Sequence, residues 1–336
     1  MIQARGLARS FRTRRGTVNA VRGVDIDVAP GELVGFLGPN GAGKTTTLRM
    51  LTTLLAPTAG TATVAGCDLF ADPVGVRRRI GYVGQAGGAG PDCPVLDELV
   101  LQGRLYGLAP GQARARGSEL LEQLDLSGTT RRLAGTLSGG QRRRLDIAMG
   151  LMHVPGLLFM DEPTTGLDPQ SRANLWQHIR ALRAEHGMTL FLTTHYLDEA
   201  DALCDRILVI DSGRIVAQGS PDELKRTVAG DTVAVGTDAP ARAAQLAEAL
   251  PGATSLSVDG IAVRFRVPRG STALPVLLRE LDAAGIALES VEVHRPTLDD
   301  VFLTLTGRSL RDAESGAPQA VPPNMPVKPE PALPTT

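Results

Sequence analysis

The segment from Gly38 to Thr45 reads G-P-N-G-A-G-K-T and has the glycine spacing, lysine and hydroxyl of a phosphate-binding loop. It follows the apolar run Leu33 to Leu37 and precedes a helical pattern, Thr45 to Leu54. Glycines let backbone N–H groups approach phosphate oxygens, and the first amides of a helix add positive charge. We expect Lys44 to contact the β- and γ-phosphates of ATP and the Thr45 hydroxyl to ligate Mg²⁺. The predicted phosphate-binding residues are Gly38, Pro39, Asn40, Gly41, Ala42, Gly43, Lys44, Thr45 and Thr46.

Two adjacent carboxylates end a second apolar run, Leu158 to Met160. A buried strand rarely ends in two acids unless they are used. We expect Asp161 to hold Mg²⁺ through water and Glu162 to polarise the water that attacks the nucleotide. Taken alone, an ordinary pair of strand-end acids explains the pattern equally well, and the phosphate-binding loop favours the catalytic interpretation.

A second candidate anion-binding segment, Leu137-Ser138-Gly139-Gly140-Gln141, precedes a predicted helix, Arg142 to Met152. It combines a hydroxyl, unhindered amides and a helix N-terminus. Since the phosphate-binding loop already encloses the phosphates of one ATP, this segment is expected to bind the ATP held by a second copy of the protein. The alternative is a serine that caps the helix, followed by two flexible glycines. The predicted ATP contacts are Ser138, Gly139, Gly140 and Gln141.

These segments, with Gln85 after the strand Ile80 to Val83, the run Asp161 to Asp168, and His195, occur in the order typical of ABC ATPases. The resemblance covers about two-thirds of the chain. It implies ATP sandwiched between two head-to-tail protomers, with Asp168 bridging them. It also implies that Gln85 senses Mg²⁺ and the attacking water, and that His195 contacts the γ-phosphate. The implied catalytic residues are Glu162, His195, Gln85 and Lys44, and the implied metal-binding residues are Thr45, Gln85 and Asp161.

Two of these assignments compete with structural explanations. Phe11 lies where ABC ATPases keep the aromatic residue that stacks on adenine, although tyrosine is more usual there, and a core phenylalanine is the alternative. Taken alone, His195 would be interpreted as a structural histidine. Its place after the strand Thr189 to Leu192 favours the catalytic role.

The element pattern predicts an α/β P-loop fold over residues 1–228, with a helical subdomain at about 86–136. Residues 229–310 follow the order β-α-β-β-α-β, which predicts a small ferredoxin-like α+β module. Its elements are predicted at 232–235, 240–250, 254–258, 261–267, 273–284 and 290–294. The Pro-rich segment 311–336 is predicted to be a disordered tail.

Composition excludes several classes of protein. The net charge of −1 gives no general attraction to nucleic acid, and the arginine runs Arg77 to Arg79 and Arg142 to Arg144 are expected to be solvated helix faces. The cysteines Cys67, Cys93 and Cys204 are too scattered for a zinc or disulfide site and indicate a reduced cytosolic protein. The sequence contains neither a secretion signal nor a run of about 18 apolar residues. Any membrane function would therefore require docking on another subunit.

The sequence from Arg142 to Leu145 and the end of the C-terminal module, Pro296 to Phe302, resemble the daunorubicin-resistance type of ABC exporter. This implies an ATPase subunit at the cytoplasmic face of the membrane, driving a separate integral-membrane permease that exports drugs, antibiotics or lipids. One alternative is a soluble ABC ATPase that acts on ribosomes or DNA, and a second is a protein that binds ATP without hydrolysing it. No nucleic-acid partner is expected. The glycine-rich stretch Ala86 to Gly90 has no assigned role and lies where the partner-contacting surface should begin.

Overall fold

The computed structural model describes residues 1–14, 16–228 and 230–306. The predicted tail 311–336 lies outside these residues. No helix within the described ranges is long and apolar enough to cross a membrane.

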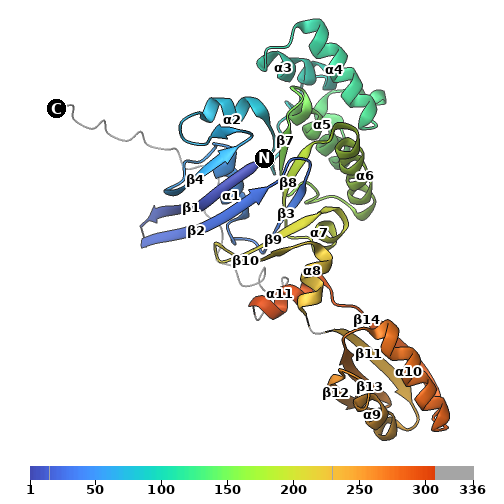
Figure 1. Ribbon diagram of the computed structural model, residues 1–336. Helices are drawn as coiled ribbons and strands as arrows, with labels where there is room; N and C mark the ends of the chain where they lie inside the picture. The colour runs from blue at the N-terminus through green and yellow to red at the C-terminus, as the bar shows by residue number, and fades with distance from the viewer. Residues whose placement is uncertain (15, 229, 307–336) are drawn as a thin grey trace.

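A six-stranded sheet forms the centre of the large domain (Figure 1). Its strands are, in order, β10 (Arg214–Gly219), β9 (Arg206–Asp211), β3 (Leu33–Leu37), β8 (Thr189–Thr194), β7 (Leu157–Asp161) and β6 (Ile80–Val83). All neighbours are parallel except β10, which pairs antiparallel with β9. The carboxyl ends of parallel strands meet at one edge of a sheet. The segments that follow β3, β6, β7 and β8 therefore converge there.

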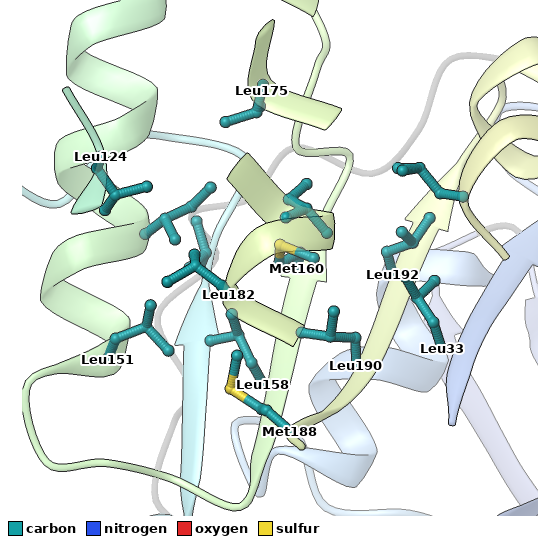
Figure 2. Packing of buried hydrophobic residues seen from close by; sticks show 14 of the residues in the cluster. Leu33, Leu124, Leu151, Leu158, Met160, Leu175, Leu182, Met188, Leu190 and Leu192 are labelled. Atoms are coloured by element: carbon teal, nitrogen blue, oxygen red, sulfur yellow. The ribbon is translucent and has the colours of Figure 1, made fainter. Parts of the chain in front are cut away.

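Helices cover this sheet and bury its apolar strands, as Figure 1 shows. They are α1 (Lys44–Leu51), α2 (Pro73–Arg79), α5 (Gly139–Leu151), α6 (Pro169–His186), α7 (Leu197–Leu203) and α8 (Pro221–Thr227). Figure 2 shows part of the main core cluster, in which Leu158 of β7 and Leu190 of β8 pack with Leu151 of α5 and Leu182 of α6. Strands β3, β7 and β8 are buried along their whole length, which explains their continuous apolar sequence.

A second, antiparallel sheet lies on the other side of α1 and shares a core cluster with α1 and with one face of the six-stranded sheet. It contains β2 (Gly16–Val28), β1 (Ile2–Thr13), β4 (Ala59–Val64) and β5 (Cys67–Asp68), in that order. The sequence pattern did not distinguish this sheet from the alternating α/β region. Its strands are half-buried and irregular, with register shifts in the β1–β2 pairing.

The predicted helical subdomain is present as α3 (Val95–Leu105), α4 (Pro110–Gln123) and two 3₁₀ turns, Ser127–Thr129 and Ala134–Thr136. Helix α5 then returns the chain to the sheet. It begins at Gly139, three residues before the predicted start at Arg142, because the Ser138 hydroxyl accepts the Gln141 N–H and caps it. The glycines of this segment therefore form the first helical turn instead of preceding the helix.

The C-terminal module folds as β11 (Asp231–Thr237), α9 (Pro240–Glu248), β12 (Thr254–Asp259), β13 (Ala262–Val267), α10 (Gly270–Ala283) and β14 (Leu288–His294). Its antiparallel sheet has the order β12-β13-β11-β14, and its apolar core is separate from the others. This arrangement confirms the predicted ferredoxin-like module.

A last helix, α11 (Leu298–Thr306), was not predicted and returns from the module to the large domain (Figure 1). Its side chains Leu298, Val301 and Phe302 are buried in the main core cluster together with Leu224 of α8. The segment Pro296 to Phe302 thus attaches the end of the module to the large domain by apolar packing.

Replacing Phe302 by alanine is expected to lower the free energy of unfolding of the large domain by about 3–5 kcal/mol, because Phe302 is 1% exposed. Urea unfolding followed through the single tryptophan, Trp176, reports on this cluster directly. The matched control is Leu303→Ala on the same helix, where the side chain is 46% exposed and the expected change is within about 0.5 kcal/mol. Equal effects of the two substitutions would contradict the packing role of α11.

Candidate nucleotide site

The phosphate-binding loop connects β3 to α1 at the converging strand ends. Gly43 adopts a left-handed backbone with φ of 108°, and a β-carbon there would lie 2.6 Å from the Ala20 carbonyl oxygen of β2. A β-carbon on Gly38 would lie 2.2 Å from the Ile210 carbonyl oxygen. Only glycine fits at either position. No side chain caps the N-terminus of α1, so its first amides face the loop.

Lys44 is almost fully buried under this loop, with 4% of its surface exposed. Its ammonium group donates to the carbonyl oxygens of Gly38 at 2.7 Å and Pro39 at 3.1 Å. It also lies 3.4 Å from Glu162 Oε1. The lysine charge is therefore held at the mouth of the loop, beside the predicted catalytic carboxylate.

Asp161 forms the buried end of β7 and lies beside Thr45. The hydroxyl of Thr45 donates to Asp161 Oδ1 at 3.1 Å, and that of Thr193 donates to the same oxygen at 2.6 Å. Burial raises the pKa of the Asp161 carboxyl, and these two hydrogen bonds oppose the rise. Within the described residues, no three His, Cys, Asp or Glu side chains gather to hold a metal ion. One carboxylate beside one hydroxyl suits Mg²⁺, which commonly takes its other ligands from water and phosphate.

Glu162 is surrounded by the other predicted catalytic residues. His195 Nδ1, on the segment after β8, lies 3.4 Å from Glu162 Oε1. Gln85, two residues beyond β6, donates its amide to Oε2 at 3.2 Å, and the Thr165 hydroxyl donates to the same oxygen at 3.2 Å. The sheet edge thus brings Lys44, Gln85, Glu162 and His195 together.

These neighbours set the ionisation of Glu162. Burial would raise the pKa of its carboxyl, but His195 and Lys44 outweigh burial and lower the pKa to about 2. The backbone of Glu162 is left-handed, with φ of 46°, which is unusual for a residue other than glycine. Its N–H donates to both the Thr193 hydroxyl, at 3.0 Å, and the Thr193 carbonyl oxygen, at 3.1 Å. Such strained backbone persists where surrounding contacts fix it, and it is common at active sites.

The other predicted nucleotide contacts lie apart from this cluster. A pocket of about 250 Å³ is lined by Ser138, Gly140 and Gln141 and by the start of α6, which includes Ser171. Asp168 caps α6 through the N–H and hydroxyl of Ser171, at 2.9 and 2.6 Å. Phe11 lies on β1 opposite Val18 of β2, with the Arg9 guanidinium 4.8 Å from its ring.

One expectation about the arginine runs was wrong. Arg142 is exposed, but Arg143 is buried and donates hydrogen bonds to the carbonyl oxygens of Pro163, Gly84 and Asp161. Adjacent residues on a helix face different ways, so a run of arginines does not show which one turns inward. Thr193 was also missed, because a threonine within an apolar strand looks like an ordinary strand residue.

The glycine-rich stretch has a structural explanation. The Gly88 N–H donates to Asp146 Oδ1 of α5 at 3.0 Å, and the Gly90 N–H donates to Glu98 Oε1 of α3 at 2.9 Å. A β-carbon on Gly90 would lie 2.7 Å from the Glu98 oxygen. Two buried carboxylates therefore bind the backbone of this stretch at close range, and the absence of side chains permits it.

Comparison with known proteins agrees with this geometry. Residues 21–165 match the family model described as "ABC transporter", and residues 219–306 match that of the "ATP-binding protein DrrA1-3-like, C-terminal domain". The chain is 46% identical over 306 residues to the daunorubicin resistance ATP-binding protein DrrA3 of Streptomyces coeruleorubidus, covering 90% of this chain and 96% of that one. It is 44% identical over 299 residues to the doxorubicin resistance ATP-binding protein DrrA of Mycobacterium tuberculosis, covering 87% and 90%.

A solved structure provides the corresponding comparison of folds. An ATP-binding cassette determined as a dimer, in a post-hydrolysis state with ADP and Pi, superimposes with a TM-score of 0.60 at 25% identity. The match covers 66% of this chain and 98% of that one. The predicted ABC-type P-loop fold is confirmed, and the chain is an ATP-binding, ATP-hydrolysing subunit. It belongs to the ABC transporter ATP-binding proteins, in the group of the daunorubicin and doxorubicin resistance proteins.

Proposed function

We propose that this subunit drives a separate integral-membrane permease that exports drugs, antibiotics or lipids, from the cytoplasmic face of the membrane. The observation that carries the proposal is the similarity to drug-resistance ATP-binding proteins over most of the chain, including the C-terminal module. The assembled site around Glu162 supports hydrolysis as the energy source.

In the proposed reaction, Glu162 polarises the water that attacks the γ-phosphate. Its low pKa keeps the carboxylate ionised at neutral pH and ready to accept a hydrogen bond from that water. Lys44 and His195 already lie at its Oε1 atom, so a γ-phosphate bound between them would be close to the attacking water. Gln85 donates a hydrogen bond to the other carboxylate oxygen of Glu162, Oε2, and so links Glu162 to the segment that follows β6.

Mg²⁺ would be held by Thr45 and Asp161, with Gln85 near the same edge of the sheet. The bound ion would supply positive charge that neutralises the phosphates. The Asp161 carboxylate is already oriented by this chain's own residues, because the Thr193 and Thr45 hydroxyls donate hydrogen bonds to it.

We further propose a head-to-tail dimer that closes on ATP. Ser138, Gly139, Gly140 and Gln141 form a helix N-terminus away from the Glu162 cluster, where they could complete the partner's site. Asp168 would bridge the protomers, and Phe11 would stack on adenine. The dimeric state of the cassette with the similar fold supports this arrangement. Closing favoured by ATP and opening favoured by hydrolysis would move the permease between two states.

The test is a pull-down of tagged Glu162→Gln, with Mg-ATP, from detergent-solubilised native membranes. The substitution is expected to hold the closed, ATP-loaded state, so that the permease is recovered and can be identified by mass spectrometry. The control is the same pull-down with Lys44→Ala, which should not load ATP and should recover less of the partner. Recovery of ribosomes or nucleic acid, with no integral membrane protein, would overturn the exporter proposal.

A further inference from the structure

Helix α5 carries two buried charged side chains that the reaction described so far does not use. Arg143 and Asp146 are 7% and 8% exposed, and the closest atoms of the pair lie 3.9 Å apart. Both point toward the strand ends that present the catalytic residues. The same helix is capped by Ser138, the proposed contact to the ATP of a second protomer.

The guanidinium of Arg143 binds three backbone carbonyls from two different strand ends. Its Nε donates to Pro163 at 2.7 Å, its Nη2 to Asp161 at 3.0 Å, and its Nη1 to Gly84 at 2.5 Å. Asp161 and Pro163 are the residues on either side of Glu162, and Gly84 directly precedes Gln85. The guanidinium is planar and has fixed donor directions, so it can hold these three carbonyls at set angles, whereas an ammonium is a compact charge on a flexible stem.

These bonds explain how Glu162 keeps its left-handed backbone. A left-handed residue other than glycine is strained and persists only when its surroundings fix it. Here Arg143 fixes the carbonyls before and after Glu162, and Thr193 accepts the Glu162 N–H. The direction of the Glu162 side chain therefore depends on Arg143.

Asp146 holds the opposite side of the Gln85 segment. Its carboxylate accepts the N–H of Gly88 at 3.0 Å, three residues after Gln85, while Arg143 binds the carbonyl of Gly84 just before it. A β-carbon on Gly87 would come within 3.4 Å of the same carboxylate, so the backbone lies against it. The Gln85 segment is thus attached to α5 at both of its ends.

We propose that Arg143 is a positioning residue for ATP hydrolysis, which places Glu162 and Gln85 together. Through α5, it would link their placement to Ser138 and so to the ATP bound by the partner protomer. This inference rests on the proposed roles of Glu162 and Gln85. It adds a physical connection, within one subunit, between the two ATP sites of the dimer.

The test compares Arg143→Met and Arg143→Lys with Arg142→Met, in the full-length chain. Arg142 is the adjacent, exposed arginine on the same helix and donates to Gly135 instead of to the strand ends. ATP turnover is measured as kcat and KM, nucleotide affinity is measured separately, and urea unfolding identifies the folded variants. Small displacements of catalytic groups can cost about 100-fold in rate. We therefore expect kcat to fall by about 100-fold in Arg143→Met and about tenfold in Arg143→Lys, with unchanged affinity for ATP and an unaffected Arg142→Met.

Arg143→Lys keeps the buried charge, so it decides the question if Arg143→Met does not fold. A folded Arg143 variant with the kcat of the original protein would overturn the proposal. A parallel loss of kcat and nucleotide affinity would also overturn it, because Arg143 would then only support the fold of the cassette. Measuring Glu162→Gln in the same assay distinguishes failure of the Arg143 proposal from failure of the role proposed for Glu162. If that variant turns over normally, the assigned role of Glu162 fails, whatever Arg143 does.

Discussion

Glu162→Gln is expected to lower kcat for ATP hydrolysis by roughly 10²- to 10⁴-fold, the range contributed by a general base. The amide keeps the size of the side chain and can still meet Lys44 and Gln85, but it cannot accept the proton of the attacking water. Nucleotide binding should survive, because the phosphate loop from Gly38 to Thr45 is unchanged. The measurement is steady-state phosphate release together with ATP affinity.

Asp161, the carboxylate that precedes Glu162 at the end of β7, provides a comparison. Asp161→Asn should impair Mg²⁺-dependent ATP binding, because Asp161 is hydrogen-bonded to Thr45, the other residue proposed to hold Mg²⁺. The expected pattern is therefore a kcat defect at Glu162 and a binding defect at Asp161. Normal turnover by Glu162→Gln would contradict its role as the catalytic carboxylate and would require another base.

Lys44→Ala is expected to weaken ATP binding by about 2–5 kcal/mol, or roughly 30- to 4,000-fold in Kd, the usual cost of removing a buried partner from a charge pair. Lys44 is buried at the loop mouth, where its ammonium group contacts the carbonyl oxygens of Gly38 and Pro39 and the Glu162 carboxylate. Equilibrium binding of a fluorescent ATP analogue gives the change in Kd.

Lys225→Ala is the matched control, since lysine is rare in this chain and Lys225 pairs with Asp201 at the surface, 2.5 Å away. It should leave ATP affinity unchanged. Urea unfolding of both variants distinguishes a binding defect from a folding defect. Tight ATP binding by a folded Lys44→Ala protein would rule out the predicted phosphate contact.

The sequence by itself predicted most of the candidate nucleotide site, because its motifs depend on local backbone chemistry. The glycines and lysine of Gly38 to Thr45 define a loop whose function follows from adjacent residues. The acid pair after Leu158 to Met160 marks the end of a buried strand, and the parallel strands predicted around it must end at one edge. These motifs predicted the roles of Lys44 and Glu162, whereas the resemblance to ABC ATPases was needed to add Gln85 and His195.

Only the tertiary structure decided which side chains support that site from other elements. Arg143 and Arg142 are adjacent and chemically identical, yet one is buried against Gly84, Asp161 and Pro163 and the other is solvated. The role of the stretch Ala86 to Gly90 likewise depended on Asp146 and Glu98, which reach it from two separate helices. Helix α11 was missed because its apolar face is buried against α7 and α8, far earlier in the chain. Such contacts lie between elements that are far apart in the chain, and they depend on how those elements pack together, which local sequence patterns do not show. A phosphate-binding loop, in contrast, is built from consecutive residues.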